Sequence, residues 1–109
     1  MRTYTILQLK KDKIHEKGFM MLSFIDKKFG GVKLGDYKLT YTGEIGYGDI
    51  DVILEELYFI FNCSQPKDFV GHSLSVGDII EINEKNGDQK FYYCDSIGFK
   101  EILIKENKL

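Results

Sequence analysis

The sequence predicts an α+β domain: a mainly antiparallel sheet of about five to six strands, with one long helix at about 49–62 and one short helix at about 23–30 packed against it. Three observations lead to this fold. Several short segments alternate apolar and polar residues, one segment repeats apolar residues at helical spacing, and Asn86-Gly87 separates two strand-like segments as hairpin turns do. A chain of 109 residues has the length for a single domain, 1–109, around one core.

Two strands are predicted in the first half of the chain. Residues 3–10 (TYTILQLK) mix β-branched, aromatic and aliphatic side chains, which favours an opening strand that is half buried. Residues 37–45 (YKLTYTGEI) alternate large apolar side chains with Lys and Thr, which indicates a second strand. The polar segment 11–18 (KDKIHEKG) is interpreted as a connection.

Residues 19–31 (FMMLSFIDKKFGG) fit two structures. Their apolar residues alternate as in a strand at the beginning, and fall on one face of a helix towards Gly30-Gly31, where a helix can end. We favour a short strand to about Leu22, followed by one or two helical turns.

The clearest helix covers 49–62 (DIDVILEELYFIFN). Asp49 can cap its N-terminus, Asp51 in the first turn suits the helix dipole, and the helix is expected to end at Asn62. Its apolar residues form one stripe at helical spacing, which predicts a buried face. The members of this stripe are Ile50, Ile53, Leu54, Leu57 and Phe61.

The last third of the chain predicts three strands. Residues 76–84 enter a strand from a Gly-Asp turn, and residues 90–98 pair back on it through the Asn86-Gly87 turn. A bend at Gly98 then leads to a final alternating strand, 99–106. Short connections between consecutive strands favour antiparallel pairing, with the helices on one side of the sheet. Whether the sheet closes into a barrel stays open.

Charge is distributed unevenly along the chain. The net charge of −2 argues against a general or sequence-specific nucleic-acid binder and against an acidic DNA mimic. Residues 10–38 nevertheless hold eight lysines against four acids, whereas residues 39–64 hold five acids and no base. Either solvated faces of opposite sign or complementarity to a charged partner explains this pattern. The candidate partner-binding residues are Lys27, Lys28, Asp51, Glu55 and Glu56.

Metal and cofactor sites are not indicated. The two cysteines form no disulfide framework, and the four potential zinc ligands lack the close paired spacing of a zinc site. Glycine-rich stretches are present, but none continues into the Lys-Ser or Lys-Thr of a phosphate-binding loop. No signal peptide and no apolar stretch of about 20 residues is visible, so we expect a soluble cytoplasmic protein without metal or cofactor. The four potential ligands are His15, Cys63, His72 and Cys94.

The segment 68–99 (DFVGHSLSVGDIIEINEKNGDQKFYYCDSIGF) concentrates the polar residues of a potential catalytic site. His72 and Ser73 are neighbours in sequence, so on an extended chain their side chains point apart, although a turn could bring them together. We favour structural duty, with serines and aspartates satisfying backbone N–H groups in turns. A hairpin centred on the Asn-Gly turn places Asp78 roughly opposite Asp95. It also places the imidazole of His72 near the bend at 95–98.

The same segment resembles the signature of the YodL-like domain family. The pattern GHSLSVSD, followed some residues later by YYVDSFGF, is matched here except that Gly77, Cys94 and Ile97 replace a serine, a valine and a phenylalanine. With the early LQLK and the helix before Pro66, the resemblance covers nearly the whole chain. It implies no catalytic residues. The matching positions of the signature include Gly71, His72, Ser73, Leu74, Ser75, Asp78, Tyr93, Asp95, Ser96, Gly98 and Phe99.

The resemblance implies a protein of bacterial conjugative transposons, plasmids or phages. We therefore expect a small, non-enzymatic protein-binding module, with an anti-defence inhibitor (anti-CRISPR-like or anti-restriction) as the leading function. Its partner would be a host protein or ribonucleoprotein effector in the bacterial cytoplasm. The alternative is an accessory domain that binds a host cytoskeletal or cell-division protein, and a third, weaker hypothesis is an enzyme that uses His72. The oligomeric state stays open.

Overall fold

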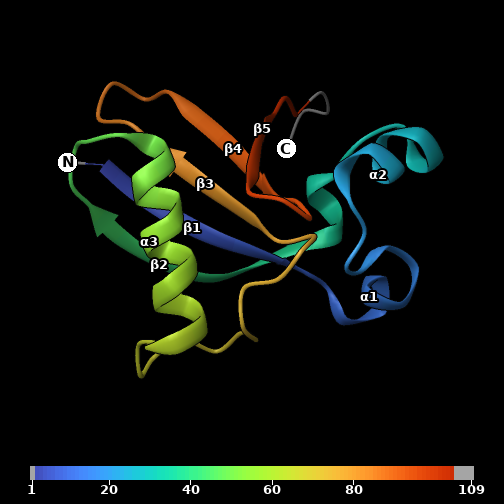
Figure 1. Cartoon of the computed structure of the whole chain (residues 1–109), viewed down its shortest axis with the longest axis horizontal. Coiled ribbons are helices and arrows are strands. Elements are labelled where there is room, and N and C mark those ends of the chain that lie inside the picture. The colour runs from blue at the N-terminus through green and yellow to red at the C-terminus, as the bar shows by residue number, and fades with distance from the viewer. Residues whose placement is uncertain (1, 105–109) are drawn as a thin grey trace.

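A computed structural model describes residues 2–104 and shows five strands in one antiparallel sheet, in the order β2-β1-β3-β4-β5 (Figure 1). The α+β class is confirmed. In chain order the elements are β1 (Arg2–Leu9), α1 (Lys11–Lys17), α2 (Leu22–Phe29), the 3-10 helix η1 (Leu34–Asp36), β2 (Tyr37–Ile45), α3 (Ile50–Cys63), β3 (Ile79–Asn83), β4 (Gln89–Cys94) and β5 (Phe99–Ile102).

The strands follow the sequence patterns closely. β1 is central and pairs with both β2 and β3, while β3 and β4 form the hairpin that the Asn86-Gly87 turn predicted. Gly87 has a φ of 99°, which favours glycine at this turn. The final strand, expected over 99–106, ends at Ile102 within the described part of the chain, and residues 105–106 lie outside it.

The long helix α3 lies across one face of the sheet (Figure 1). It begins as predicted, because the Asp49 carboxylate accepts a hydrogen bond from the backbone N–H of Asp51 at 2.9 Å. It continues one residue beyond Asn62. Its inner face packs against alternate residues of the central strands. The buried residues of this core are Tyr4, Ile6, Leu54, Leu57, Phe61, Leu74, Ile80, Ile82 and Tyr92.

The segment between β1 and β2 differs most from the prediction. Residues 11–18, interpreted as a connection, contain the helix α1, and residues 19–22 form no strand. α1 is stabilised by a contact with a residue far along the chain, because its buried Lys17 forms an ion pair with the buried Asp36. Phe19 has a φ of 61°, which no regular strand allows, and this residue turns the chain from α1 towards α2.

The helices cover both faces of the sheet rather than one. Ile25 of α2 packs with Ile79 and Tyr93, whereas α3 packs with Ile80 and its neighbours. Because successive side chains of a strand point to opposite faces, Ile79 and Ile80 assign α2 and α3 to opposite sides. The prediction of helices on a single side was therefore wrong, because the sequence pattern of α2 does not indicate which face of the sheet it covers.

Candidate functional site: the signature loop and two charged helix faces

The loop 71–78 is the last part of the connection from α3 to β3, and the Asp78 carboxylate organises it. Asp78 Oδ2 accepts hydrogen bonds from the backbone N–H of Ser75 at 2.8 Å and from Gln8 Nε2 at 3.0 Å. Ser75 Oγ donates to the carbonyl oxygen of Ser73 at 2.9 Å. These local bonds hold the turn that leads into β3, as is common for Ser and Asp side chains.

Gln8 is a site residue that sequence reasoning missed. Its side chain is fully buried, and Nε2 also donates to the carbonyl oxygen of His72 at 2.9 Å. Gln8 Oε1, by contrast, is buried without a hydrogen-bond partner among the described residues. A Cβ atom at Gly71 would overlap this oxygen, so glycine is required there for space. The available signal was a glutamine within an otherwise apolar run of the first strand.

The Asp78 side chain is buried. Burial raises the pKa of Asp78 to about 6, against hydrogen bonds from Gln8 and Ser75 and the charge of His72, which all lower it. None of the ion pairs between described residues involves Asp78. The neighbouring Cys94 thiol has its pKa raised to about 12, by burial first and then by Asp78 and Asp95, so it is not an activated nucleophile.

Asp78 does not lie opposite Asp95, contrary to the prediction. The hairpin pairs Ile79 with Tyr93, and the backbone N–H of Cys94 donates to Asp78, so the residue opposite Asp78 is Cys94. The prediction was therefore wrong by one residue. Asp95 Oδ1 instead accepts from the backbone N–H of Leu22 at 3.0 Å, the first residue of α2.

His72 also lies elsewhere than predicted. Its Nδ1 is 2.7 Å from the carbonyl oxygen of Ser73 and 3.3 Å from Gln8 Nε2, so its hydrogen-bond partners are not in the bend at 95–98. A carbonyl oxygen only accepts, so Nδ1 carries the proton in the shorter contact. Ser73 Oγ is paired with Gln65 Nε2 at 3.4 Å rather than with the imidazole. The geometry does not arrange His72 and Ser73 as base and nucleophile.

The signature loop lines a cavity of about 330 Å³ next to α1. Phe19 stands at this cavity with 67% of its surface exposed and with the positive φ noted above, a conformation that costs free energy for a bulky residue. Strained, exposed aromatic residues are often found at binding sites. The lining consists of Leu9, Ile14, Gly18, Phe19, His72, Ser73, Ser75, Val76 and Asp78.

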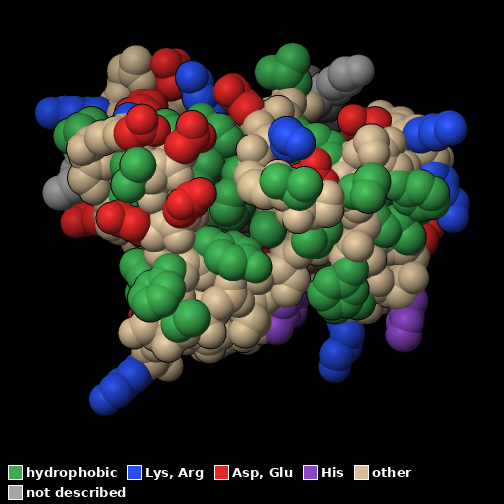
Figure 2. All heavy atoms as spheres, viewed as in Figure 1, with side chains coloured by type: hydrophobic (Ala, Val, Ile, Leu, Met, Phe, Trp, Pro, Cys, Tyr) green, Lys and Arg blue, Asp and Glu red, His purple; other side chains and the backbone are tan. Residues whose placement is uncertain are grey.

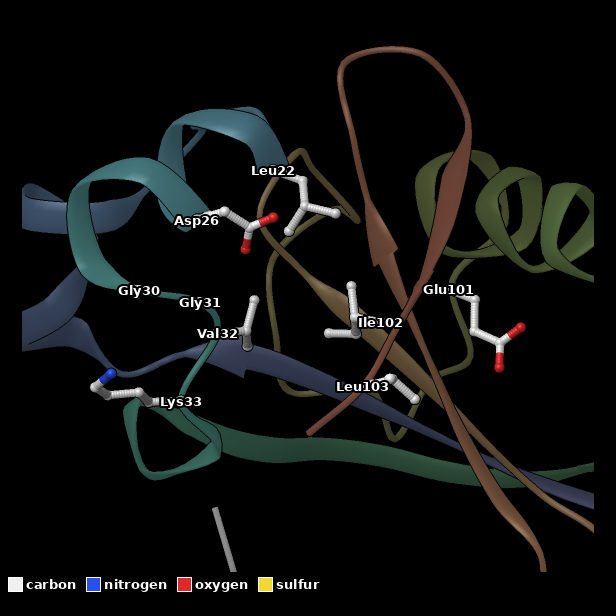
Figure 3. A pocket seen from close by; sticks show the side chains of 9 residues that line it. All are labelled: Leu22, Asp26, Gly30, Gly31, Val32, Lys33, Glu101, Ile102 and Leu103. Carbon is white, nitrogen blue, oxygen red and sulfur yellow. The ribbon is translucent and has the colours of Figure 1, made fainter. Parts of the chain in front are cut away.

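A larger cavity of about 490 Å³ lies between the end of α2 and β5 (Figure 3). Gly30 ends α2 there in the left-handed conformation. The charged side chains that line this cavity, from Asp26, Lys33 and Glu101, point in different directions and do not converge on one position (Figure 3). The smaller cavity of the signature loop is therefore the better candidate for a ligand.

The candidate partner-binding residues form two separate surfaces. Asp51, Glu55 and Glu56 are exposed on α3, and Lys27 and Lys28 are exposed on α2. The two helices lie at opposite ends of the longest axis (Figure 1). Figure 2 shows acidic and hydrophobic side chains together over α3.

Hydrophobic side chains on the outer side of α3 were not anticipated as a surface. Val52 and Phe59 are 55% and 61% exposed, and they line a hollow with Glu55, Glu56 and Ile60. The signal in the sequence was a helix with apolar residues outside its buried stripe. We call the exposed residues Asp51, Val52, Glu55, Glu56 and Phe59 the outer face of α3.

Potential metal ligands do not gather in the part of the chain that the structure describes. Within residues 2–104, no group of three or more His, Cys, Asp or Glu side chains could hold a metal ion. None of the helices that the structure describes combines the length and apolar composition needed to cross a bilayer.

Comparison with known proteins identifies a family. Residues 3–104 match the family model of the YodL-like domain, so the match includes nearly all of β1 and every later element. No curated protein and no solved structure matches the chain.

Proposed function

The chain belongs to the YodL-like domain family, and on this premise we propose that it is a non-enzymatic protein-binding module whose outer face of α3 docks on a basic surface of a bacterial host protein. The observation that carries the proposal is the exposure of Val52 and Phe59 beside Glu55 and Glu56. A surface helix normally turns its apolar residues inward, and α3 already does so with Leu57 and its neighbours. Additional apolar residues facing water mark an interaction surface.

The charge of this face specifies the partner. Residues 39–64 contain no Lys or Arg, so the acids of α3 have no basic neighbours in sequence. A basic protein surface is complementary to such a face, and charge complementarity increases both association rate and specificity. Proteins that bind nucleic acids present basic surfaces of this kind.

The proposed anti-defence role uses this complementarity. A small acidic and apolar face that covers the basic channel of a nuclease or ribonucleoprotein effector would exclude its nucleic acid. An inhibitor of the anti-CRISPR or anti-restriction type, acting in the bacterial cytoplasm and encoded by a mobile element, is therefore our leading specific proposal. Its support is the charge of α3 together with the resemblance of the signature to proteins of mobile elements.

Affinity capture from host lysate, followed by mass spectrometry, tests the proposal. The bait is the full chain, compared with a Glu55→Lys/Glu56→Lys variant. The matched control is Lys27→Glu/Lys28→Glu, which reverses the same number of charges on α2. We expect one host protein with the wild type and the control but not with the α3 variant, and weaker capture at high salt.

The identity of the captured protein decides between the specific functions. A nuclease or ribonucleoprotein supports the inhibitor, whereas a filament or division protein supports the cytoskeletal alternative. Loss of capture with the α2 pair and not with the α3 pair would overturn the assignment of the surface. Capture unaffected by either pair would show that both charged faces are only solvated.

The apolar part of the outer face has its own control. Phe59 on α3 and Leu39 on β2 are both 61% exposed, so truncation of either leaves the core intact. Phe59→Ala should weaken binding of the captured partner by about tenfold or more, as for an interface anchor. Leu39→Ala should leave it within about twofold. Equal effects of the two substitutions would contradict docking on α3.

A further inference from the structure

The Asp78 carboxylate is buried, and no ion pair between described residues neutralises it. The residue is 3% exposed; a buried carboxylate is costly to keep ionised, and the charge of His72 offsets only part of this cost. The carboxylate accepts two hydrogen bonds, from the backbone N–H of Ser75 and from Gln8 Nε2, and both end on Oδ2. Oδ1 therefore has no hydrogen bond from residues 2–104. An acceptor is therefore available at this cavity.

The Gln8 amide is oriented by two acceptors, Asp78 Oδ2 and the carbonyl oxygen of His72. Rotating the Gln8 amide by half a turn would move its unpartnered Oε1 away from the crowded side at Gly71, but would place that oxygen against Asp78 Oδ2. The amide nitrogen instead donates to both acceptors, and Oε1 is left without a partner among the described residues. Donors arranged around a carboxylate favour its charged form.

The walls of the cavity around Asp78 are mainly hydrocarbon. Leu9, Ile14, Phe19 and Val76 contribute aliphatic and aromatic surface, and a volume of about 330 Å³ lies within the range of ligand pockets. A ligand that fits must combine an apolar stem with a cationic end. Lysine and arginine side chains have this composition, because their methylene stems pack on apolar surface while the head group pairs with a carboxylate.

We propose that the signature-loop cavity is a receptor for one lysine or arginine side chain of the protein partner, with the alkyl stem between Phe19 and Val76 and the cationic head at Asp78. This deepens the proposed function and rests on it for the identity of the partner. An anionic ligand would be repelled by the carboxylate. A bound metal ion would require further ligands of a kind that residues 2–104 do not gather here.

The position of Val76 connects this cavity to α3. Val76 also lines a second hollow, which includes Glu55 and Tyr58 of α3, and Glu55 in turn borders the hollow at Phe59. A basic segment on the outer face of α3 could therefore continue past Val76 to Asp78. The signature loop would then bind one cationic side chain of the same partner segment that docks on α3.

Titration of the isotope-labelled full chain with n-butylguanidinium, monitored by NMR, tests the cavity without any partner. The neutral isostere n-butylurea has the same stem and lacks the charge. We expect saturable shifts at the amides of Phe19, Val76 and Asp78 with the guanidinium, and binding of the urea weaker by about tenfold. Equal binding of both compounds, or no shifts at these amides up to the solubility limit, would overturn the proposal.

Two variants assign the preference to Asp78. Asp78→Asn keeps the size of the side chain and should abolish the preference for guanidinium over urea. Phe19→Ala changes an exposed position and keeps the carboxylate. It should weaken the binding of both compounds and retain the preference for guanidinium over urea. Retention of the preference in a folded Asp78→Asn variant would place the cation elsewhere. If that variant does not fold, loss of the preference in Phe19→Ala would contradict the assignment.

The outcomes separate this inference from the proposed function. If the guanidinium shifts only amides of α3, near Glu55 and Glu56, the cavity is not the cation site, but the outer face of α3 remains a candidate surface. If the cavity binds the guanidinium while host capture is indifferent to the Glu55→Lys/Glu56→Lys change, the receptor stands and the docking face fails. The two experiments share no readout.

Discussion

The two helical parts of this domain are stabilised in different ways. α3 has 14 residues, its own side-chain cap at Asp49 and a continuous inner face in the core. α1 and α2 have seven and eight residues and no side-chain hydrogen bond at their N-caps. Isolated helices of that length are not stable in water, so contacts from elsewhere in the chain must hold them.

Those contacts are both apolar and polar: Ile25 of α2 is buried against Ile79 and Tyr93, and hydrogen bonds reach α2 from distant residues. The hydroxyl of Tyr93 donates to the carbonyl oxygen of Met20 at 2.7 Å, and Asp95 accepts from the first N–H of α2. α3 therefore depends mainly on apolar burial, whereas α1 and α2 combine a smaller apolar core with hydrogen bonds and an ion pair from distant residues. The cavity at Asp78 lies beside α1, so a single polar substitution there should have a visible local effect.

The largest effect is expected in the core beneath α3. Leu57→Ala should lower the free energy of unfolding by about 2–5 kcal/mol, because it removes buried methyl groups and leaves a cavity. Chemical denaturation measures the change, and Val52→Ala on the outer face is the control, expected within about 0.5 kcal/mol. A loss below about 1 kcal/mol for Leu57→Ala would mean that the inner stripe is not the core.

Asp78 should make stability depend on pH in an unusual direction. Burial raises its pKa in the folded protein to about 6, above the value in the unfolded chain, so the folded state holds the proton more tightly. Its contribution to stability is thus lost as the pH rises from about 4 to about 6. The difference in unfolding free energy between wild type and Asp78→Asn should change by on the order of 2–3 kcal/mol across this interval. Parallel stability curves would show that Asp78 titrates normally.

Asp95→Asn should have a smaller effect, concentrated on α2. Burial raises the pKa of Asp95, but hydrogen bonds from Leu22 and Ser96 and the charge of Lys100 lower it more, so the net pKa is lowered. Its stabilisation is therefore present above the unfolded pKa and is lost as the pH falls through the folded one. Replacement should cost about 1 kcal/mol near neutral pH, as for a lost helix cap, and less in acid. An undiminished cost at acidic pH would contradict the role of the charge.

The smallest effect is expected at His72. Its side chain is exposed, and the bond from Gln8 ends on its backbone oxygen, which any residue provides. His72→Asn should therefore change the unfolding free energy by less than about 0.5 kcal/mol and leave partner binding nearly intact. A folded variant of unchanged stability that loses all binding or activity would revive a direct role for the imidazole.

The same contrast explains which parts of the structure could be predicted from the sequence. The α3 helix, the Asn86-Gly87 hairpin and the strand over 37–45 carry their signals locally, as periodicity, capping or turn residues. α1 carries no such signal, because its formation depends on the pairing of Lys17 with Asp36, which lie far apart in sequence. Local patterns cannot reveal a helix that tertiary contacts stabilise.

The candidate site was predictable only in part for a related reason. The signature drew attention to the loop at His72 and Asp78, but Gln8, its main partner, comes from the first strand. The expected pairing of Asp78 with Asp95 failed by one residue, which is enough to reverse the face of a strand. Turn residues fix the existence of a hairpin more reliably than its register.

Native-state hydrogen exchange of the wild type and Asp95→Asn shows whether the two halves are stabilised separately. With the cap removed, amides of α2, such as Ile25, should exchange faster, while those of Leu54 and Leu57 in α3 change only by the small loss of global stability. This result would show that the hydrogen bond from Leu22 to Asp95 stabilises α2 in addition to its apolar contacts and independently of α3. Equal acceleration in both helices, or none in α2, would contradict separate stabilisation of the two halves.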